Sequence, residues 1–188
     1  MRIGVVSDTH GYFDPKLREL LASVEVILHA GDVDSQNILD ELELIAPVHA
    51  VRGNVDSADL NLPPSLTLLF EGVQIQMQHK LPAPQSEVES RSKGFLAGKT
   101  HAGWRDDFLN NYDRGTRVVI FGHSHEPCLI TLGHILFFNP GSAGKKRFSL
   151  PRCCGLLEIT SKGIQAGMMS LDGEDQNLPE KVRLPHTT

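Results

Sequence analysis

Cysteine is scarce in this chain. Only three of its 188 residues are cysteines, and two of these are neighbours: Cys128, Cys153 and Cys154. An odd number with this spacing does not make the disulfide framework of a small secreted domain. A Cys-x-x-Cys pair is also missing, which excludes a zinc knuckle. We therefore expect buried, reduced thiols.

The chain also lacks a long apolar run. No segment approaches the roughly 18 apolar residues that a membrane-spanning helix needs. The apolar residues that follow Arg2 are too few for the core of a signal peptide and end at Ser7-Asp8. We expect a cytoplasmic protein that does not enter a membrane.

An excess of basic residues is absent as well. Lysine and arginine number 18 against 23 acidic residues, which gives a net charge of −5. Such a chain has no general basic surface for bulk nucleic-acid binding. Its 40% hydrophobic and 22% charged residues are typical of one globular domain. We expect that domain over residues 1–171, with a frayed or disordered polar tail over 172–188; whether the chain forms a homo-oligomer is left open.

Apolar periodicity predicts alternating strands and helices in the first half. Short apolar runs that suit strands buried on both faces alternate with leucine-rich segments at helical spacing. The strands are expected at 3–6, 26–28 and 48–51, and the helices at 14–23 and 35–45. This alternation is typical of βαβ units with a parallel sheet.

The second half favours hairpins instead. Paired apolar runs flank turn residues at three places, and a further buried strand is expected at 118–121. The hairpins are expected at 66–70 with 73–77, 128–132 with 135–138, and 156–159 with 164–168. We predict an α/β fold of two mixed sheets packed face to face, with helices outside. Residues 82–115 show no clear pattern apart from a short helix near 104–112, and we interpret them as a lid or insert.

Metal-capable side chains follow five of the expected strands. In open α/β sheets, ligands bind at the carboxyl ends of the strands, so these clusters should share one rim. Imidazole, carboxylate and amide donors suit Mn²⁺, Fe, Zn²⁺ or Co²⁺ better than Ca²⁺. The clusters are Ser7-Asp8-Thr9-His10, His29-Ala30-Gly31-Asp32, Arg52-Gly53-Asn54-Val55-Asp56, Gln78-His79 and Gly122-His123-Ser124-His125.

This ordered set, followed by Asn139-Pro140-Gly141-Ser142, resembles the calcineurin-like metallophosphoesterases. The similarity covers roughly residues 1–170 and is greatest to their compact bacterial and archaeal phosphodiesterase branch. It implies a four-layer αββα sandwich and two divalent metal ions, Mn²⁺ foremost, with Fe, Zn²⁺, Co²⁺ or Ni²⁺ as alternatives. The first metal would be held by Asp8, His10, Asp32 and His125. The second would be held by Asp32, Asn54, His79 and His123, with Asp32 bridging.

The resemblance also implies a reaction, in which a metal-bridging hydroxide attacks the phosphorus of a small phosphoester. Asp32 and Asn54 are the expected catalytic residues. Many relatives carry a histidine that protonates the leaving group at the position of Val55, which can donate nothing. Asp56 could replace it, although a role in the turn is equally open. We therefore expect a preference for aryl or activated phosphodiesters over alkyl phosphates.

We expect substrate contacts from Asn54, Gly141, Ser142 and Arg147. Arg147 lies in a basic run, which is also typical of a solvent-exposed loop. Relatives continue the His79 motif with glycine and histidine, whereas Lys80 and Leu81 follow here. Lys80 either faces the phosphate or points to solvent.

Two alternative functions remain. One is a phosphomonoesterase or nucleotidase, which only substrate profiling would separate. The other is a scaffold like the retromer subunit of the same fold, whose metal cage is eroded. All seven ligand types are present here, which favours the enzyme.

Overall fold

The structure is a computed structural model that describes residues 1–96, 102–147, 149–173 and 178–185. Its first half contains β1 (Arg2–Val6), α1 (Lys16–Leu20), β2 (Val26–His29), α2 (Gln36–Glu43), β3 (Val48–Ala50), a 3-10 turn (Ala58–Leu60), β4 (Ser65–Phe70) and β5 (Val73–Gln78). Its second half contains α3 (Gln85–Leu96), α4 (Ala102–Leu109), β6 (Thr116–Ile120), β7 (Cys128–Leu132), β8 (Ile135–Asn139), β9 (Cys153–Thr160), β10 (Gly163–Ser170) and β11 (Val182–Leu184).

The strands form two mixed sheets. Sheet A has the order β11-β10-β9-β1-β2-β3, and sheet B has the order β4-β5-β6-β8-β7. β1, β2 and β3 are parallel to one another, as their alternation with α1 and α2 predicts. The three expected hairpins are β4–β5, β7–β8 and β9–β10, and all three pair antiparallel. The predicted α/β class with two mixed sheets is confirmed.

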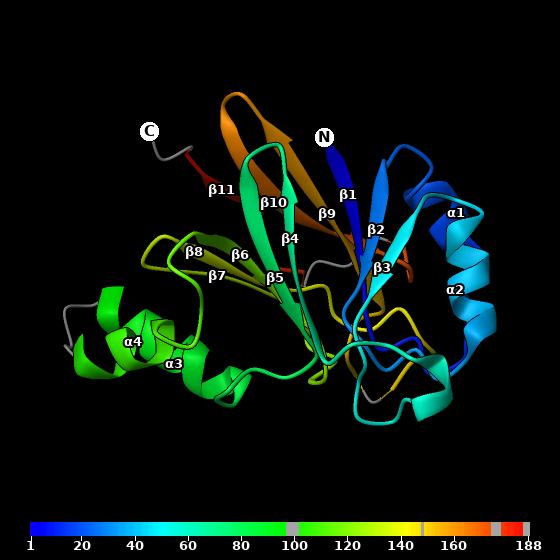
Figure 1. Ribbon diagram of the computed structural model, residues 1–188, viewed down its shortest axis with the longest axis horizontal. Coiled ribbons are helices and arrows are strands. Elements are labelled where there is room, and N and C mark those ends of the chain that lie inside the picture. The colour runs from blue at the N-terminus through cyan, green and yellow to red at the C-terminus, as the bar shows by residue number, and fades with distance from the viewer. Residues whose placement is uncertain (97–101, 148, 174–177, 186–188) are drawn as a thin grey trace.

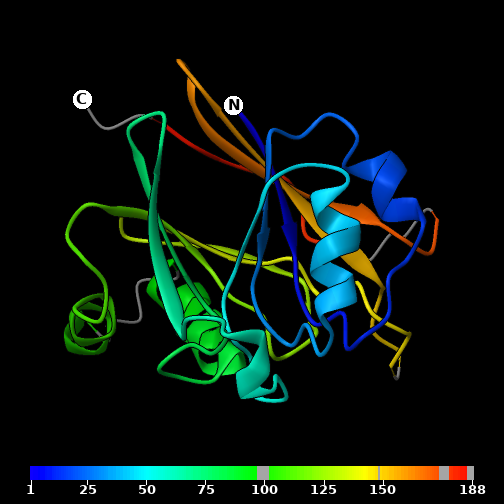
Figure 2. The ribbon, with the colours of Figure 1, turned by 45° about the vertical axis from the view of Figure 1, so that its right-hand side comes forward.

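Three apolar layers hold the sandwich together. The central one lies between the sheets and includes Ile3, Val5, Ile75 and Phe138. A second joins α1 and α2 to the outer face of sheet A, where Leu17, Leu21, Ile38 and Leu42 are fully or almost fully buried. A third joins α3 and α4 to the outer face of sheet B. Figure 1 shows the two helix pairs on opposite sides of the sheets, and Figure 2 shows the same arrangement of layers with the molecule rotated about the vertical axis.

The segment 82–115 contributes α3 and α4 to this outer layer. Val88, Phe108 and Tyr112 are buried against Val119 and Phe137 of sheet B. Residues 97–101 lie outside the described part of the chain. The segment therefore packs as one layer of the sandwich, while its action as a lid stays a prediction. None of the described helices is both long and apolar enough to cross a membrane.

The tail differs from the expected frayed segment. Val182–Leu184 form β11, which pairs antiparallel with β10 at the edge of sheet A. Leu184 is only 8% exposed and belongs to the central apolar layer. The prediction of a frayed or disordered tail is wrong for these residues, because they pair with β10 and Leu184 and Val182 pack against the central apolar layer. Residues 174–177 and 186–188 lie outside the described residues.

Candidate metal centre

Loops from both sheets meet at one rim of the sandwich. β1, β2 and β3 end in sheet A, and β5 and β6 end in sheet B, so five strand ends face this rim, at the lower side of Figure 1. The loops after β1 and β2 are joined by backbone hydrogen bonds from Asp8 N to Gly31 O and from His10 N to Asp32 O, both 3.0 Å long. The sheets are connected by His123 N, which donates to Asp8 Oδ2 at 3.1 Å.

The first group of candidate ligands consists of Asp8, His10 and His125. His125 Nε2 lies 3.3 Å from Asp8 Oδ1 and 3.2 Å from His10 Nε2. Neighbouring ligand atoms around an ion with bonds of about 2.1 Å are roughly 3 Å apart, so this spacing suits one metal ion.

The second group consists of Asp32, His79 and His123. His79 Nε2 lies 3.3 Å from Asp32 Oδ1 and 3.2 Å from Asn54 Oδ1. The rings of His79 and His123 are 5.3 Å apart between centroids. Carboxylate, amide and imidazole donors therefore converge here as well.

Asp32 lies between the two groups. Its Oδ1 faces His79, while its Oδ2 lies 3.8 Å from His10 Nε2 in the first group. The side chain is 3% exposed. The seven predicted ligands are thus brought to one place, with Asp32 in contact with both halves.

The donor atoms themselves support a fit to metal ions. Asp8 Oδ1 is buried and has no hydrogen-bond donor among the described residues, whereas Oδ2 accepts from Ser7 Oγ at 2.6 Å and from His123 N. An unpaired buried carboxylate oxygen is costly, and a cation would satisfy it.

The backbone is strained where the ligands sit. Five of the eight non-glycine residues with positive φ in the described chain are candidate ligands: Asp8, His10, Asp32, His123 and His125. Such conformations are unfavourable for side-chain-bearing residues and cluster at functional sites. The turns are so tight that a Cβ at Gly53 would collide with Asp32, and one at Gly122 would collide with Ser7.

Hydrogen bonding fixes the tautomer of His79. Its Nδ1 lies 2.8 Å from the carbonyl oxygen of Ala30, which can only accept, so Nδ1 carries the hydrogen. Nε2 faces two acceptors, Asp32 Oδ1 and Asn54 Oδ1. Burial lowers the pKa of the ring, but the hydrogen bond that protonated Nε2 donates to Asp32 outweighs it and raises the pKa of His79. Loss of that proton leaves the Nε2 lone pair for a metal ion. A backbone carbonyl behind a histidine is the usual means of orienting a metal ligand.

The electrostatics of the site favour charge on Asp32. Burial by itself raises the pKa of this carboxyl group, but the hydrogen bonds from His79 and from Val55 N outweigh it and hold the pKa far below its usual range. Burial and the charge of Arg147 lower the pKa of His10. Burial and the charge of Lys80 lower the pKa of His123. Neutral imidazoles and an ionised carboxylate are the forms that bind metals.

His29 is a supporting residue to which the sequence analysis gave no role. Gly31 N donates to its Nδ1 at 3.2 Å, and its Nε2 contacts Thr9 Oγ1 at 3.0 Å. Burial lowers its pKa to about 4, so the ring is neutral. The sequence did hold a signal for this role. His29 ends the apolar segment Val26–His29, and a polar side chain buried there needs hydrogen-bond partners.

Asn139 supports the neighbouring loop. Its Nδ2 donates to Gly122 O at 3.0 Å, and its Oδ1 accepts from Gly141 N at 2.9 Å. Ser142 Oγ donates to Asp8 O at 2.8 Å. Gly141 and Ser142 are buried, and the Gly141 N–H and the Ser142 hydroxyl already donate hydrogen bonds within the protein. This geometry disfavours the substrate contacts expected for them.

Asp56 is occupied in the same way. Its Oδ2 accepts from Gly53 N and its Oδ1 from Asp34 N, both at 2.7 Å. This geometry favours the turn-stabilising role over that of a proton donor. Val55 is 46% exposed, and its backbone N–H, not its side chain, contacts Asp32.

The charges at the rim are Lys80 and Arg147. Both side chains are exposed, and each lies close enough to a candidate ligand to lower its pKa. Lys80, whose direction the sequence left open, thus acts electrostatically on the His123 side, and Arg147 on the His10 side.

A family model described as the calcineurin-like phosphoesterase superfamily domain matches residues 1–162. The chain belongs to this superfamily. The resemblance drawn from the motifs is confirmed, and with it the phosphoesterase fold.

Archaeal phosphoesterases are among the similar proteins. A probable metallophosphoesterase of Methanocaldococcus jannaschii is 36% identical over 159 residues, which cover 81% of this chain and 71% of that protein. One of Methanothermobacter thermautotrophicus is 32% identical over 161 residues, with coverage of 80% and 82%.

Among solved structures, Vps29 of Chaetomium thermophilum has a TM-score of 0.74 at 21% identity, with full coverage of both chains. At this identity the likeness concerns the fold alone.

Proposed function

We propose that this calcineurin-like phosphoesterase uses two metal ions to hydrolyse a small phosphodiester. The observation that carries the proposal is the position of Asp32 between two groups of donors, one of which contains the unpaired Asp8 Oδ1. A 28% identical protein of M. jannaschii named phosphodiesterase supports the choice of diester.

The residues that would hold the ions are those the resemblance implied. Asp8, His10, Asp32 and His125 suit one ion, and Asp32, Asn54, His79 and His123 suit the other. Mn²⁺ is the expected metal, because mixed imidazole, carboxylate and amide donors fit it. When bound, the two ions supply Lewis-acid activation of water and neutralise charge on the phosphoryl group.

The protein's own groups set the rest of the chemistry. Hydrolysis adds a water oxygen to phosphorus, breaks the bond to one ester oxygen and releases that oxygen as an alcohol or phenol. Asn54 is exposed beside His79 and so can reach the phosphoryl oxygens, while Arg147 adds positive charge on the His10 side. Val55 has no proton to give, and both carboxylate oxygens of Asp56 accept hydrogen bonds from backbone amides, so neither of these two residues is placed to protonate the leaving oxygen.

The decisive test is metal content and turnover of wild type and Asp32→Ala, each loaded with Mn²⁺. We expect the wild type to bind two ions and to cleave bis(4-nitrophenyl) phosphate faster than an alkyl phosphomonoester. Asp32→Ala should lose at least one ion and reduce kcat by a factor on the order of 10³.

A matched control is Asp40→Ala, which removes an exposed carboxylate from α2, on the outer face of sheet A. It should keep both ions and the wild-type rate. The proposal fails if Asp32→Ala retains two ions and full turnover. Faster cleavage of alkyl monoesters than of aryl diesters would instead favour the phosphomonoesterase alternative.

The scaffold alternative has the fold of Vps29 in its favour. Against it stand the complete ligand set and the strained turns that present it. A chain that binds no metal above background would support the scaffold.

A further inference from the structure

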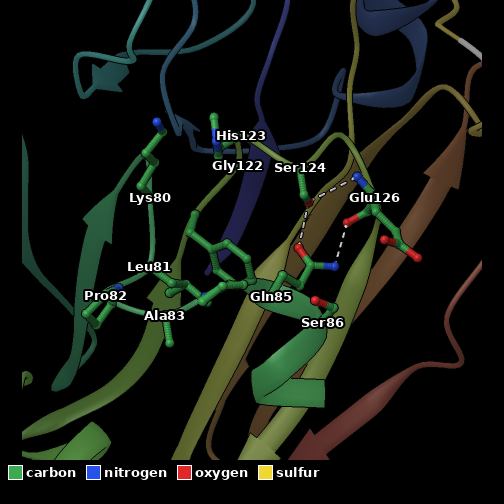
Figure 3. Close-up of a pocket in the computed structure, with 12 residues that line it drawn as sticks. Lys80, Leu81, Pro82, Ala83, Gln85, Ser86, Gly122, His123, Ser124 and Glu126 are labelled. Carbon is green, nitrogen blue, oxygen red and sulfur yellow. Dashed lines mark hydrogen bonds between the residues drawn. The ribbon is translucent and has the colours of Figure 1, made fainter. Parts of the chain in front are cut away.

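A pocket of about 520 Å³ opens directly beside the second ligand group. One wall is the connection from β5 to α3, which includes Lys80, Leu81, Pro82 and Ala83, and the other is the loop after β6 with His123. Figure 3 shows Lys80 and His123 at one end of the pocket, and Gln85 and Ser86 toward the other. The volume lies within the range of small-molecule sites, about 300–1,000 Å³.

The wall made by the β5–α3 connection is apolar. Leu81 and Ala83 are half-buried against the layer that contains Phe108 and Phe137, so their backbone is held in place. Pro82 is exposed, and Phe121 adds a buried aromatic ring to the lining. Such a surface recognises a ligand by contact with apolar atoms.

The side-chain amide of Gln85, behind this wall, is already paired. Gln85 Oε1 accepts from Ser124 Oγ at 2.6 Å and from Asn139 Nδ2 at 2.9 Å, as Figure 3 shows for the serine. Gln85 Nε2 donates to Glu89 and to the carbonyl of Glu126. This network ties the first turn of α3 to the loop that carries the candidate ligands His123 and His125.

Positive charge is concentrated at the end nearest the metal ligands. Lys80 is exposed and near His123, whose pKa its charge lowers. Among the described residues, Lys80 has no ion-pair partner. Its ammonium group is available to an anion placed between the metal ligands and the pocket.

We propose that this pocket binds an aromatic substituent of the phosphoester, with Lys80 contacting its phosphoryl oxygens. The inference rests on the proposed function, since it takes the phosphorus to lie at the metal ligands. A diester with an aromatic group fills both the metal site and the pocket, whereas a monoester of a small alcohol leaves the apolar wall exposed to water. The Pro82–Gln85 part of the expected lid thereby acquires a role in specificity.

The test measures binding of phosphinates, in which carbon replaces both ester oxygens so that hydrolysis cannot occur. Titration calorimetry with the Mn²⁺-loaded protein compares methyl(naphthylmethyl)phosphinate with dimethylphosphinate. We expect the naphthyl compound to bind at least about tenfold more tightly, because burial of its apolar surface is favourable.

Two variants fill the pocket: Ala83→Phe on the half-buried wall, and Ser86→Trp at an exposed position that tolerates a large side chain. Both should bring the affinity ratio of the two phosphinates close to one. Ala22→Phe adds the same ring at an exposed position after α1 and should preserve the wild-type ratio. Lys80→Met should weaken both compounds several-fold and leave their ratio intact.

The pocket assignment is overturned by a wild-type ratio near one, or by an unchanged ratio in both filling variants. Naphthyl preference without any turnover of diesters would contradict the proposed function alone. Turnover of diesters without the preference would contradict the pocket assignment alone.

Discussion

His29 is a buried ionisable side chain whose protonation opposes folding. Its pKa is lowered to about 4 by burial, against 6.5 in an unfolded chain. As the pH falls, the unfolded chain therefore takes up this proton first. The stability that neutral His29 contributes is fully present above pH 6.5 and is lost between pH 6.5 and about 4, up to ~3 kcal/mol.

Urea unfolding between pH 4 and 8, with EDTA present, measures this effect. His29→Gln keeps an amide that can meet Thr9 and Gly31 but cannot titrate. We expect it to be less stable than wild type at pH 7.5 and to lose stability less steeply below pH 6.5. Parallel pH dependences of the two proteins would show that His29 does not titrate in this way.

At the scale of elements, β11 is an edge strand of sheet A that contains only three residues. Leu184 is 8% exposed within the central apolar layer, while its neighbour Arg183 is exposed. We predict that Leu184→Ala lowers the free energy of unfolding by about 2 kcal/mol, because it removes buried apolar surface.

Arg183→Ala is the matched control on the same strand. It removes a hydrogen bond to Gln165 that is exposed to solvent, so its cost should stay below about 0.5 kcal/mol. Denaturant titration of the two variants measures both values. Equal effects would mean that β11 is held by its backbone pairing and not by the leucine.

At the scale of the whole molecule, the metal centre joins the two sheets. Asp8, His10, Asp32 and Asn54 come from loops of sheet A, and His79, His123 and His125 come from loops of sheet B. Ions bound across this boundary stabilise the folded state by mass action, by ~2.7 kcal/mol at a metal concentration of 100 Kd. We predict that Mn²⁺ raises the Tm of the EDTA-treated protein by about 5–10 °C.

Differential scanning calorimetry with and without Mn²⁺ measures the shift. Asp32→Ala should show a much smaller one, since it removes the carboxylate that both groups share. An unchanged Tm in the wild type at saturating Mn²⁺ would exclude ions that link the sheets.

The candidate ligands could be predicted from the sequence because their positions at strand ends are locally encoded. Asp8 and Asp32 each follow an apolar strand of sheet A, and the ends of parallel strands in one sheet share an edge. His123 follows an apolar strand of sheet B, so its approach to Asp8 depends on how the two sheets pack. The hairpin turn at Glu71-Gly72 was equally readable, because a glycine, which tolerates the positive φ found there, separates two apolar runs.

Other features depend on contacts between residues far apart in the chain. The hydroxyl of Ser142 donates a hydrogen bond to Asp8 O, 134 positions away. The carboxylate of Asp56 accepts one from Asp34 N, 22 positions away. No local sequence pattern predicts either contact, so the expected roles of Ser142 and Asp56 could not be judged from the sequence.

The sequence by itself determined the family, the two-sheet architecture and the set of candidate ligands, since each rests on short-range periodicity or on motifs at strand ends. Only the tertiary structure decided that β11 pairs at the edge of sheet A, that His29 supports the ligand loops and that a pocket opens between the β5–α3 connection and His123. These features arise where separate segments pack against one another, and burial and shape exist only after that packing.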